Sequence, residues 1–222
     1  MTALFAILSF VTALAAADRL SDRGIVLEPS AGLIRFQQVE RAPEAERFDD
    51  HGARPVLGLR GWAPIGDAWD LGFGIDRSAF DATRRLESAT RDTRVEMEVL
   101  WWGVEVRRWW TAGRSGLSGT LGAGAIVLDA GEFRVDPAPP GALVPADVAP
   151  PDPRREIDAA LSAAIGVRRD LTDRMQITAE AGDVLHVCRG TPDRFTDASH
   201  LFCDRDALLH HLRIKAGLQV AL

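Results

Sequence analysis

The feature that most constrains this chain is an alternation of apolar and polar side chains with a period of two residues. From 69 to 76, Trp, Leu, Phe and Ile occupy every second position, and Asp or Gly occupies each position between them. The last segment, 212–222, repeats the alternation with Leu, Ile, Ala and Val. Successive side chains of a β-strand point to opposite faces, whereas an α-helix would distribute these residues around its axis. We therefore expect an all-β protein whose strands each have one apolar and one polar face.

Eight segments of this kind can be marked along the chain. Their expected ranges are 31–41, 54–62, 69–77, 93–110, 117–129, 155–168, 175–187 and 208–222. Most of them are long enough for a tilted transmembrane strand, which needs about 9–11 residues. Within 93–110 the apolar residues change from odd to even positions after Gly103, which predicts a β-bulge near Trp102 and Gly103.

The connections between these segments alternate in length. Three are short and hold turn-forming residues, namely 63–68, 111–116 and 169–174, and the four others are longer and polar, namely 42–53, 78–92, 130–154 and 188–207. Short turns at one end and long loops at the other are typical of bacterial outer-membrane barrels. The pattern therefore predicts an antiparallel, up-and-down, eight-stranded transmembrane β-barrel that occupies 18–222.

The chain begins with a segment that is expected to lie outside the barrel. Residues 3–17 are an unbroken run of apolar and small residues, which is short for a transmembrane helix of about 20 residues. Small residues at Ala15 and Ala17 fit a cleavage site before Asp18, so 1–17 is expected to be a signal peptide for export through the periplasm. No Lys or Arg precedes the apolar run, and an uncleaved membrane anchor is the alternative.

Alternation alone does not show which face points inward, and a soluble lipocalin-like barrel with an apolar interior is the alternative. The polar rows are rich in glycine, which suits a narrow lumen better than a solvated surface. We therefore expect the polar rows to face inward and their charges to form a paired network that fills the lumen. The charged residues expected there are Arg35, Arg60, Asp70, Asp76, Glu96, Glu98, Arg168, Glu180, Arg213 and Lys215.

Four tryptophans lie beside the short connections: Trp62, Trp69, Trp109 and Trp110. Aromatic side chains collect at the two boundaries between a membrane and water, so these four are expected to form the girdle nearest the periplasm. Packing in a protein core is the alternative for each of them.

Two stretches resemble the OmpA-like superfamily of small outer-membrane barrels. Residues 159–187 look like that family's hairpin of strand, short turn and strand, and residues 213–222 look like its final strand. Leu222 departs from the family, because an aromatic residue usually ends that strand. The resemblance implies residence in the outer membrane of a Gram-negative envelope, contact with outer-membrane lipid and lipopolysaccharide, and assembly through the C-terminal strand by the barrel-assembly machinery.

The two cysteines, Cys188 and Cys203, flank the last long loop. A disulfide between them is expected in an oxidising compartment and would contribute roughly 3 kcal/mol. Two free thiols are the alternative.

No catalytic, cofactor-binding or metal site is expected. Histidines occur at His51, His186, His200, His210 and His211, but adjacent residues of one strand point to opposite faces, which disfavours a shared metal ion. A lipid A-modifying enzyme that uses Ser199 and His200, with Asp197 or Asp204 as the third member, is the catalytic alternative.

The charge pattern argues against one class of partner. The formal net charge is −6, Lys215 is the sole lysine and no block of Lys and Arg stands out, so a nucleic-acid partner is not expected. The expected role is that of a monomeric barrel that supports the envelope or interacts at the cell surface. Beside the lipid A-modifying enzyme, the alternative is a soluble periplasmic lipocalin-like carrier.

Overall fold

The computed structural model describes residues 24–36, 46–48, 52–86, 92–112, 114–135, 154–188 and 207–222. The expected signal peptide at 1–17 lies outside these residues, as do most of the long connections. The described part of the chain has nine strands. They are β1 Val26–Phe36, β2 Glu46–Phe48, β3 Ala53–Gly66, β4 Trp69–Leu86, β5 Asp92–Ala112, β6 Ser115–Val135, β7 Arg154–Thr172, β8 Met175–Cys188 and β9 Ala207–Ala221.

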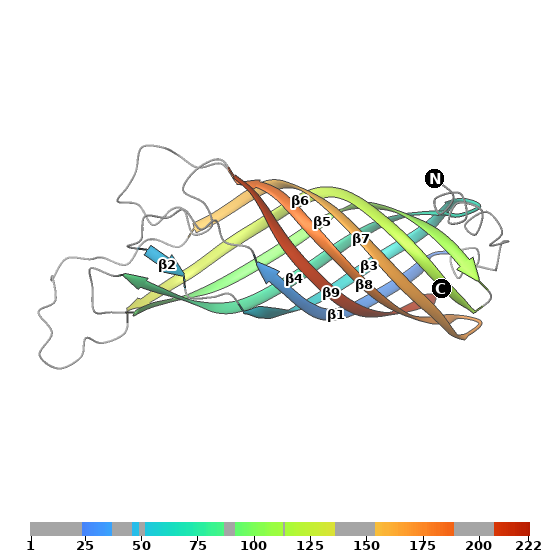
Figure 1. Cartoon of the computed structure of the whole chain (residues 1–222), viewed down its shortest axis with the longest axis horizontal. Coiled ribbons are helices and arrows are strands. Elements are labelled where there is room, and N and C mark those ends of the chain that lie inside the picture. Colours follow the sequence, from blue (N-terminus) through green and yellow to red (C-terminus); the bar gives the residue numbers. More distant parts are fainter. Residues whose placement is uncertain are drawn as a thin grey trace, which may run out of the picture.

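Eight of these strands form one closed antiparallel barrel, as the sequence predicted. The ring runs β1-β3-β4-β5-β6-β7-β8-β9, and the pairing of β9 with β1 completes it (Figure 1). The short strand β2 pairs with the C-terminal end of β4, at residues 84–86. No helix in the described residues is long and apolar enough to cross a membrane.

The register fixes how far the strands tilt. The shift can be counted by moving from each residue to its partner on the next strand, once round the ring. The path starts at Val26 of β1, passes Glu105 of β5 and His211 of β9, and returns to β1 at Phe36, ten residues further along that strand. A ten-residue shift over eight strands corresponds to a tilt of about 40° from the barrel axis. A barrel of this size has an interior that side chains can fill completely.

The two ends of the barrel differ, as the connections predicted, but the expected long connection 78–92 is wrong. Strand β4 continues to Leu86 and β5 begins at Asp92, because these strands extend beyond the membrane, and only five residues separate them. Only two residues lie between β3 and β4, between β5 and β6, and between β7 and β8, and the two ends of the described chain lie at this end as well (Figure 1). We call it the turn end, and the opposite end the loop end. In outer-membrane barrels the short turns face the periplasm and the long loops face outward.

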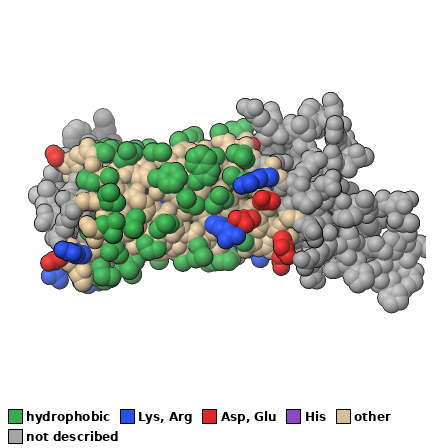
Figure 2. Space-filling model, turned by 180° about the vertical axis from the view of Figure 1, so that it is seen from behind, with side chains coloured by type: hydrophobic (Ala, Val, Ile, Leu, Met, Phe, Trp, Pro, Cys, Tyr) green, Lys and Arg blue, Asp and Glu red, His purple; other side chains and the backbone are tan. Residues whose placement is uncertain are grey.

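The direction of the two faces is clear from the burial of the side chains. On β9, Arg213, Lys215 and Gln219 are buried in the lumen, whereas Leu212 and Ile214 point outward and are 60% and 67% exposed. The same arrangement recurs on the other strands, so apolar side chains cover the middle of the outer surface (Figure 2). A soluble barrel would bury these side chains, and the lipocalin-like alternative is therefore wrong.

The apolar band has the height of a membrane. From Leu212 of β9 to Leu222, the residue that follows the strand, the outward row spans ten residues, which is about 33 Å along the strand and about 25 Å along the axis. An apolar band of about 25 Å is typical of outer-membrane barrels. The molecule is therefore a closed eight-stranded β-barrel of the outer-membrane type.

Glycines in the lumen make room for two inward-facing tryptophans. A Cβ atom at Gly72 would meet the ring of Trp62, and one at Gly103 would meet the ring of Trp101 at 3.0 Å. Each ring lies against the backbone of a glycine, where no side chain stands in its way. The glycines of the polar rows therefore serve packing within the lumen.

We expect Gly103→Val to destabilise the barrel by about 1–3 kcal/mol, because the added carbon would overpack the lumen. A Cβ atom there would lie 2.6 Å from the backbone carbonyl oxygen of Ala123, which cannot move aside easily. Gly61→Val is the matched control, because the nearest atom to a Cβ there is Leu27 Cδ2 at 3.9 Å. Urea titration of the barrel in lipid vesicles would measure both variants, and equal effects would contradict the packing argument.

The expected β-bulge near Trp102 and Gly103 is wrong. Strands β5 and β6 pair without interruption through this region, and the irregularity in their register lies between Val95 and Met97. The odd-numbered residues of β5 from Met97 to Trp109 all face the lumen. What changes at Gly103 is the polarity of the lumen, which is apolar toward the loop end and charged toward the turn end.

Candidate functional site: the filled lumen

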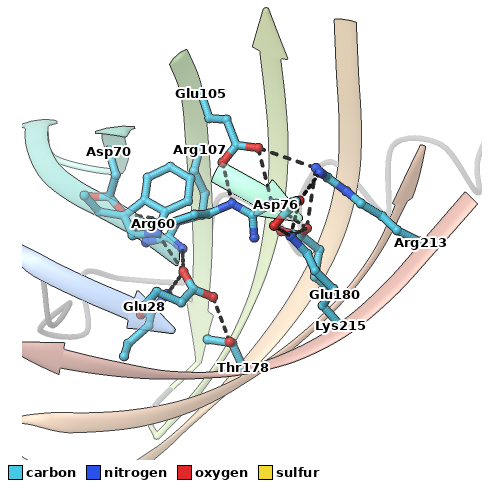
Figure 3. A network of polar contacts seen from close by, with 12 residues as sticks. Glu28, Arg60, Asp70, Asp76, Glu105, Arg107, Thr178, Glu180, Arg213 and Lys215 are labelled. Atoms are coloured by element: carbon cyan, nitrogen blue, oxygen red, sulfur yellow. Dashed lines mark hydrogen bonds and ion pairs between the residues drawn. The ribbon is translucent and has the colours of Figure 1, made fainter. Parts of the chain in front are cut away.

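The most distinctive site is a group of six charged residues in the middle of the lumen, which we call the central cluster (Figure 3). Its members come from β3, β4, β5, β8 and β9: Arg60, Asp76, Glu105, Glu180, Arg213 and Lys215. Three are cations and three are carboxylates, so the cluster is neutral when all six are ionised. Five of the six are at most 4% exposed.

Asp76 is the carboxylate that gathers the cations of the central cluster. Its Oδ2 lies 2.6 Å from Arg213 Nη1 and 2.7 Å from Lys215 Nζ. These contacts join β4 to β9, because Arg213 and Lys215 follow Asp76 by 137 and 139 residues in the sequence. They therefore tie two widely separated parts of the chain together inside the barrel.

The two glutamates complete the central cluster. Glu105 Oε2 lies 2.6 Å from Arg60 Nε, and Glu105 Oε1 lies 3.5 Å from Arg213 Nη2. Glu180 Oε1 lies between 3.3 and 3.8 Å from nitrogens of Arg60, Arg213 and Lys215. Every charge in the cluster thus has at least two partners of opposite sign, as buried ions require.

A second group, the turn-side cluster, surrounds Arg107 nearer the turn end. The guanidinium of Arg107 lies 3.1 Å from both Glu28 Oε2 and Asp70 Oδ2. It also stacks on two indole rings, with centroid distances of 3.7 Å to Trp62 and 4.5 Å to Trp109. Cation–π contacts of this kind strengthen when the cation is removed from water.

Neutral donors satisfy the remaining oxygens of the turn-side carboxylates. Glu28 accepts hydrogen bonds from Trp62 Nε1 at 2.7 Å, Thr178 Oγ1 at 2.8 Å and Gln219 Nε2 at 2.9 Å. Asp70 accepts a hydrogen bond from Trp109 Nε1 at 2.7 Å. Ions and hydrogen bonds therefore fill the lumen at this level and leave the two carboxylates fully paired.

Toward the loop end the lumen becomes apolar. A cluster of buried side chains lies there, and we call it the apolar plug: Ile34, Phe36, Val56, Val99, Trp101, Ile126, Leu128, Ala160 and Val184. His211 packs edge-on against Phe36, and its Nε2 lies 3.3 Å from His186 Nδ1. The apolar plug separates the central cluster from the long loops.

The outer surface changes polarity at the same level. Arg77 forms two hydrogen bonds of 2.8 and 2.9 Å with the carboxylate of Glu98, and both side chains are exposed. Arg155 lies 4.0 Å from Asp129 on the neighbouring strands. Charged side chains lie beside the loop end of the apolar band in Figure 2. Above the membrane the strands thus have a charged exterior around an apolar core, as in a water-soluble protein.

The structure places seven of the ten charged residues that the sequence assigned to the lumen on inward faces. They are Arg60, Asp70, Asp76, Arg168, Glu180, Arg213 and Lys215. The assignment of Arg35, Glu96 and Glu98 was wrong, because all three lie on outward faces. These three are near the loop end, where the exterior meets water and charges can be solvated.

Two of the four tryptophans assigned to the periplasmic girdle were also placed wrongly. Trp62 and Trp109 are 1% and 5% exposed and lie in the lumen, where they stack on Arg107. Trp69 of β4 lies on the outer surface, and Trp110 lies on the outward face of β5. The face of the strand, and not closeness to a turn, decides where each indole lies.

The sequence missed three central members of the lumen clusters. Glu28 precedes the first expected segment, and Glu105 and Arg107 were left out of the expected lumen residues. The signal that could have found the last two is alternation, because both lie opposite the outward-facing Val104 and Val106.

Several expected sites fall outside the described residues. Ser199, His200, Asp197 and Asp204 all lie there, as do His51 and Cys203, the partner expected for Cys188 at the end of β8. Among the residues that are described, no three His, Cys, Asp or Glu side chains lie together as a metal site would require.

Comparisons with known proteins give distant likenesses. No family model and no curated protein matches the chain. In structure the chain is similar to Neisserial surface protein A, with 12% identity, a TM-score of 0.47, and coverage of 90% of this chain and 97% of that one. It is also similar to Ail, the attachment invasion locus protein of Yersinia pestis, with 11% identity, a TM-score of 0.46, and coverage of 88% and 97%. A third likeness is to the outer membrane protein OprG from Pseudomonas aeruginosa, with 9% identity, a TM-score of 0.47, and coverage of 89% and 95%. The membrane character of the present barrel follows from its own inner and outer faces.

Proposed function

We propose that this protein is a closed, non-conducting outer-membrane barrel that acts through the long loops at its outer end and through its contact with envelope lipids. One observation carries the proposal. The lumen contains a neutral, fully paired ion cluster, and the apolar plug lies between that cluster and the loops. An ion that crossed the barrel would have to break several buried ion pairs and cross the apolar plug.

Function then belongs to the two ends of the barrel and to its outer surface. Loops that connect rigid strands carry most binding functions, and here three long connections join barrel strands at one end, namely 37–52, 136–153 and 189–206. The lipopolysaccharide leaflet surrounds that end in an outer membrane and is the partner we propose for it. We also propose that the barrel is a monomer and that the barrel-assembly machinery receives it through β9.

We expect the purified barrel to produce no discrete conductance steps in planar lipid bilayers. The physical reason is the filled lumen, and a known porin inserted by the same procedure is the control. Reproducible steps from a protein that still shows the heat-dependent gel mobility of a folded barrel would contradict the proposal.

A role of the loops can be separated from catalysis. Replacement of 136–153 or 189–206 by a short Gly-Ser linker should keep the heat-dependent mobility and weaken binding to lipopolysaccharide. Ser199→Ala and His200→Ala should leave that binding unchanged. Loss of a lipid A deacylase activity in these two point variants would instead favour an enzyme.

A further inference from the structure

The outer surface near the turn end carries an arginine that lies between two tryptophans. Arg108 of β5 pairs directly with Trp69 of β4, and all three side chains lie on the outward face. The Arg108 Cζ atom is 5.4 Å from the ring centroid of Trp69 and also 5.4 Å from that of Trp110. The guanidinium is therefore held between two indoles at the periplasmic edge of the apolar band.

A glycine on the next strand makes room for this arrangement. Gly119 of β6 pairs with Arg108 on its other side, and a Cβ atom there would lie 3.2 Å from Cη2 of Trp110. The ring of Trp110 thus lies over the position where a side chain of β6 would stand. The backbone N–H of Trp109 also donates a 2.9 Å hydrogen bond to the carbonyl oxygen of Ala68, which fixes β5 against the adjacent turn. The three side chains are held on rigid backbone.

The charge of Arg108 is not neutralised within the described chain. No carboxylate among the described residues forms an ion pair with it, and the side chain is exposed. Toward the membrane its neighbours are apolar, since Leu71 pairs with Val106 one step above and both lie on the outer surface. Such a site suits an anion at the level of the lipid headgroups with an apolar part that extends up the barrel.

We propose that Arg108, Trp69 and Trp110 form a binding site for the phosphodiester of a glycerophospholipid in the periplasmic leaflet. A guanidinium can bind two phosphate oxygens at once, and the two indoles hold its plane in place. The acyl chains lie along the apolar side chains above Arg108. Lipopolysaccharide is not the occupant, because the site is at the turn end and lipopolysaccharide occupies the opposite leaflet. The site rests on the membrane orientation proposed above and is independent of the closed lumen.

Native mass spectrometry of the full barrel in dodecyl maltoside can test this site. The barrel is titrated with phosphatidylglycerol, with phosphatidylethanolamine, and with a monoglucosyl diacylglycerol that lacks phosphate. Arg108→Ala should weaken binding of the first molecule of either phospholipid roughly tenfold, because a charge-assisted bond to phosphate is lost. It should leave binding of the glucolipid unchanged.

Arg169→Ala is the matched control. Arg169 is an exposed arginine on the outward face of β7 near the same end, and its loss should leave phospholipid binding unchanged. Arg108→Lys should reduce binding less than Arg108→Ala, since it keeps the charge and loses the planar guanidinium. All variants should keep the gel mobility of a folded barrel and remain non-conducting.

Three results would overturn the site. They are unchanged phospholipid binding by Arg108→Ala, an equal loss with Arg169→Ala, and an effect of Arg108→Ala that is confined to phosphatidylglycerol. The last would mean that net lipid charge, and not the phosphodiester, is what the protein recognises. A conducting wild-type barrel would contradict the proposed function and leave this site unaffected.

Discussion

Asp76→Asn is expected to destabilise the barrel by about 3–5 kcal/mol, the usual consequence of removing one partner from a buried ion pair. Asp76 is 4% exposed and neutralises Arg213 and Lys215 at 2.6 and 2.7 Å. Without it, three cations would share two carboxylates in a lumen that water cannot easily enter. The free energy of unfolding can be measured by urea titration in lipid vesicles.

Two further variants make this prediction specific. Glu98→Gln removes a carboxylate from an exposed ion pair on the outer surface and should leave the stability nearly unchanged. The double variant Asp76→Asn with Lys215→Met restores the balance of charges and should recover most of the lost stability. If Asp76→Asn and Glu98→Gln had the same effect, the lumen would be wet and the charges in it solvated.

Ile165→Arg is expected to destabilise the membrane-inserted barrel by about 2–4 kcal/mol, because it places a cation against the hydrocarbon. Ile165 lies on the outward face of β7 within the apolar band and is 68% exposed. In a soluble barrel a residue as exposed as this would accept arginine at almost no cost. The variant therefore tests directly whether hydrocarbon or water surrounds the middle of the barrel.

The same strand provides the control for Ile165. Ile157 also faces outward and is 66% exposed, but it is two residues from Arg155, whose partner is Asp129 above the apolar band. Ile157→Arg should cost about 0–1 kcal/mol, as is usual near the membrane boundary. Both variants can be compared by urea titration in the same vesicles, and equal costs would contradict the position of the membrane.

Local patterns made the barrel predictable. Strand periodicity and turn residues act over a few positions, so the eight strands and their up-and-down order could be inferred without tertiary information. The inward direction of the polar rows was also inferred correctly, from their glycines. The packing of the lumen accounts for this, since the ring of Trp62 lies where a side chain of Gly72 would stand.

The misplaced charges Arg35, Glu96 and Glu98 and the expected bulge have one physical cause, which is that the strands are longer than the membrane is thick. Within the membrane the lumen is charged and the exterior is apolar. Beyond the membrane, toward the loop end, the lumen is apolar and the exterior is charged. Glu98 and Glu105 are on the same strand, yet the first faces outward and the second inward. Sequence periodicity shows that the polarity changes along β5, but it does not show that the solvent changes while the strand continues unbroken.

The central cluster has a consequence for how the chain is completed during biogenesis. Asp76 is synthesised and exported long before Arg213 and Lys215, which are on the last strand, and that strand also pairs with β1 to close the ring. Until β9 joins the barrel, Asp76 lacks these two counterions, and a chain truncated before β9 does not contain them. Strand β9 is thus needed twice, because it closes the ring and also supplies two of the three cations of the central cluster.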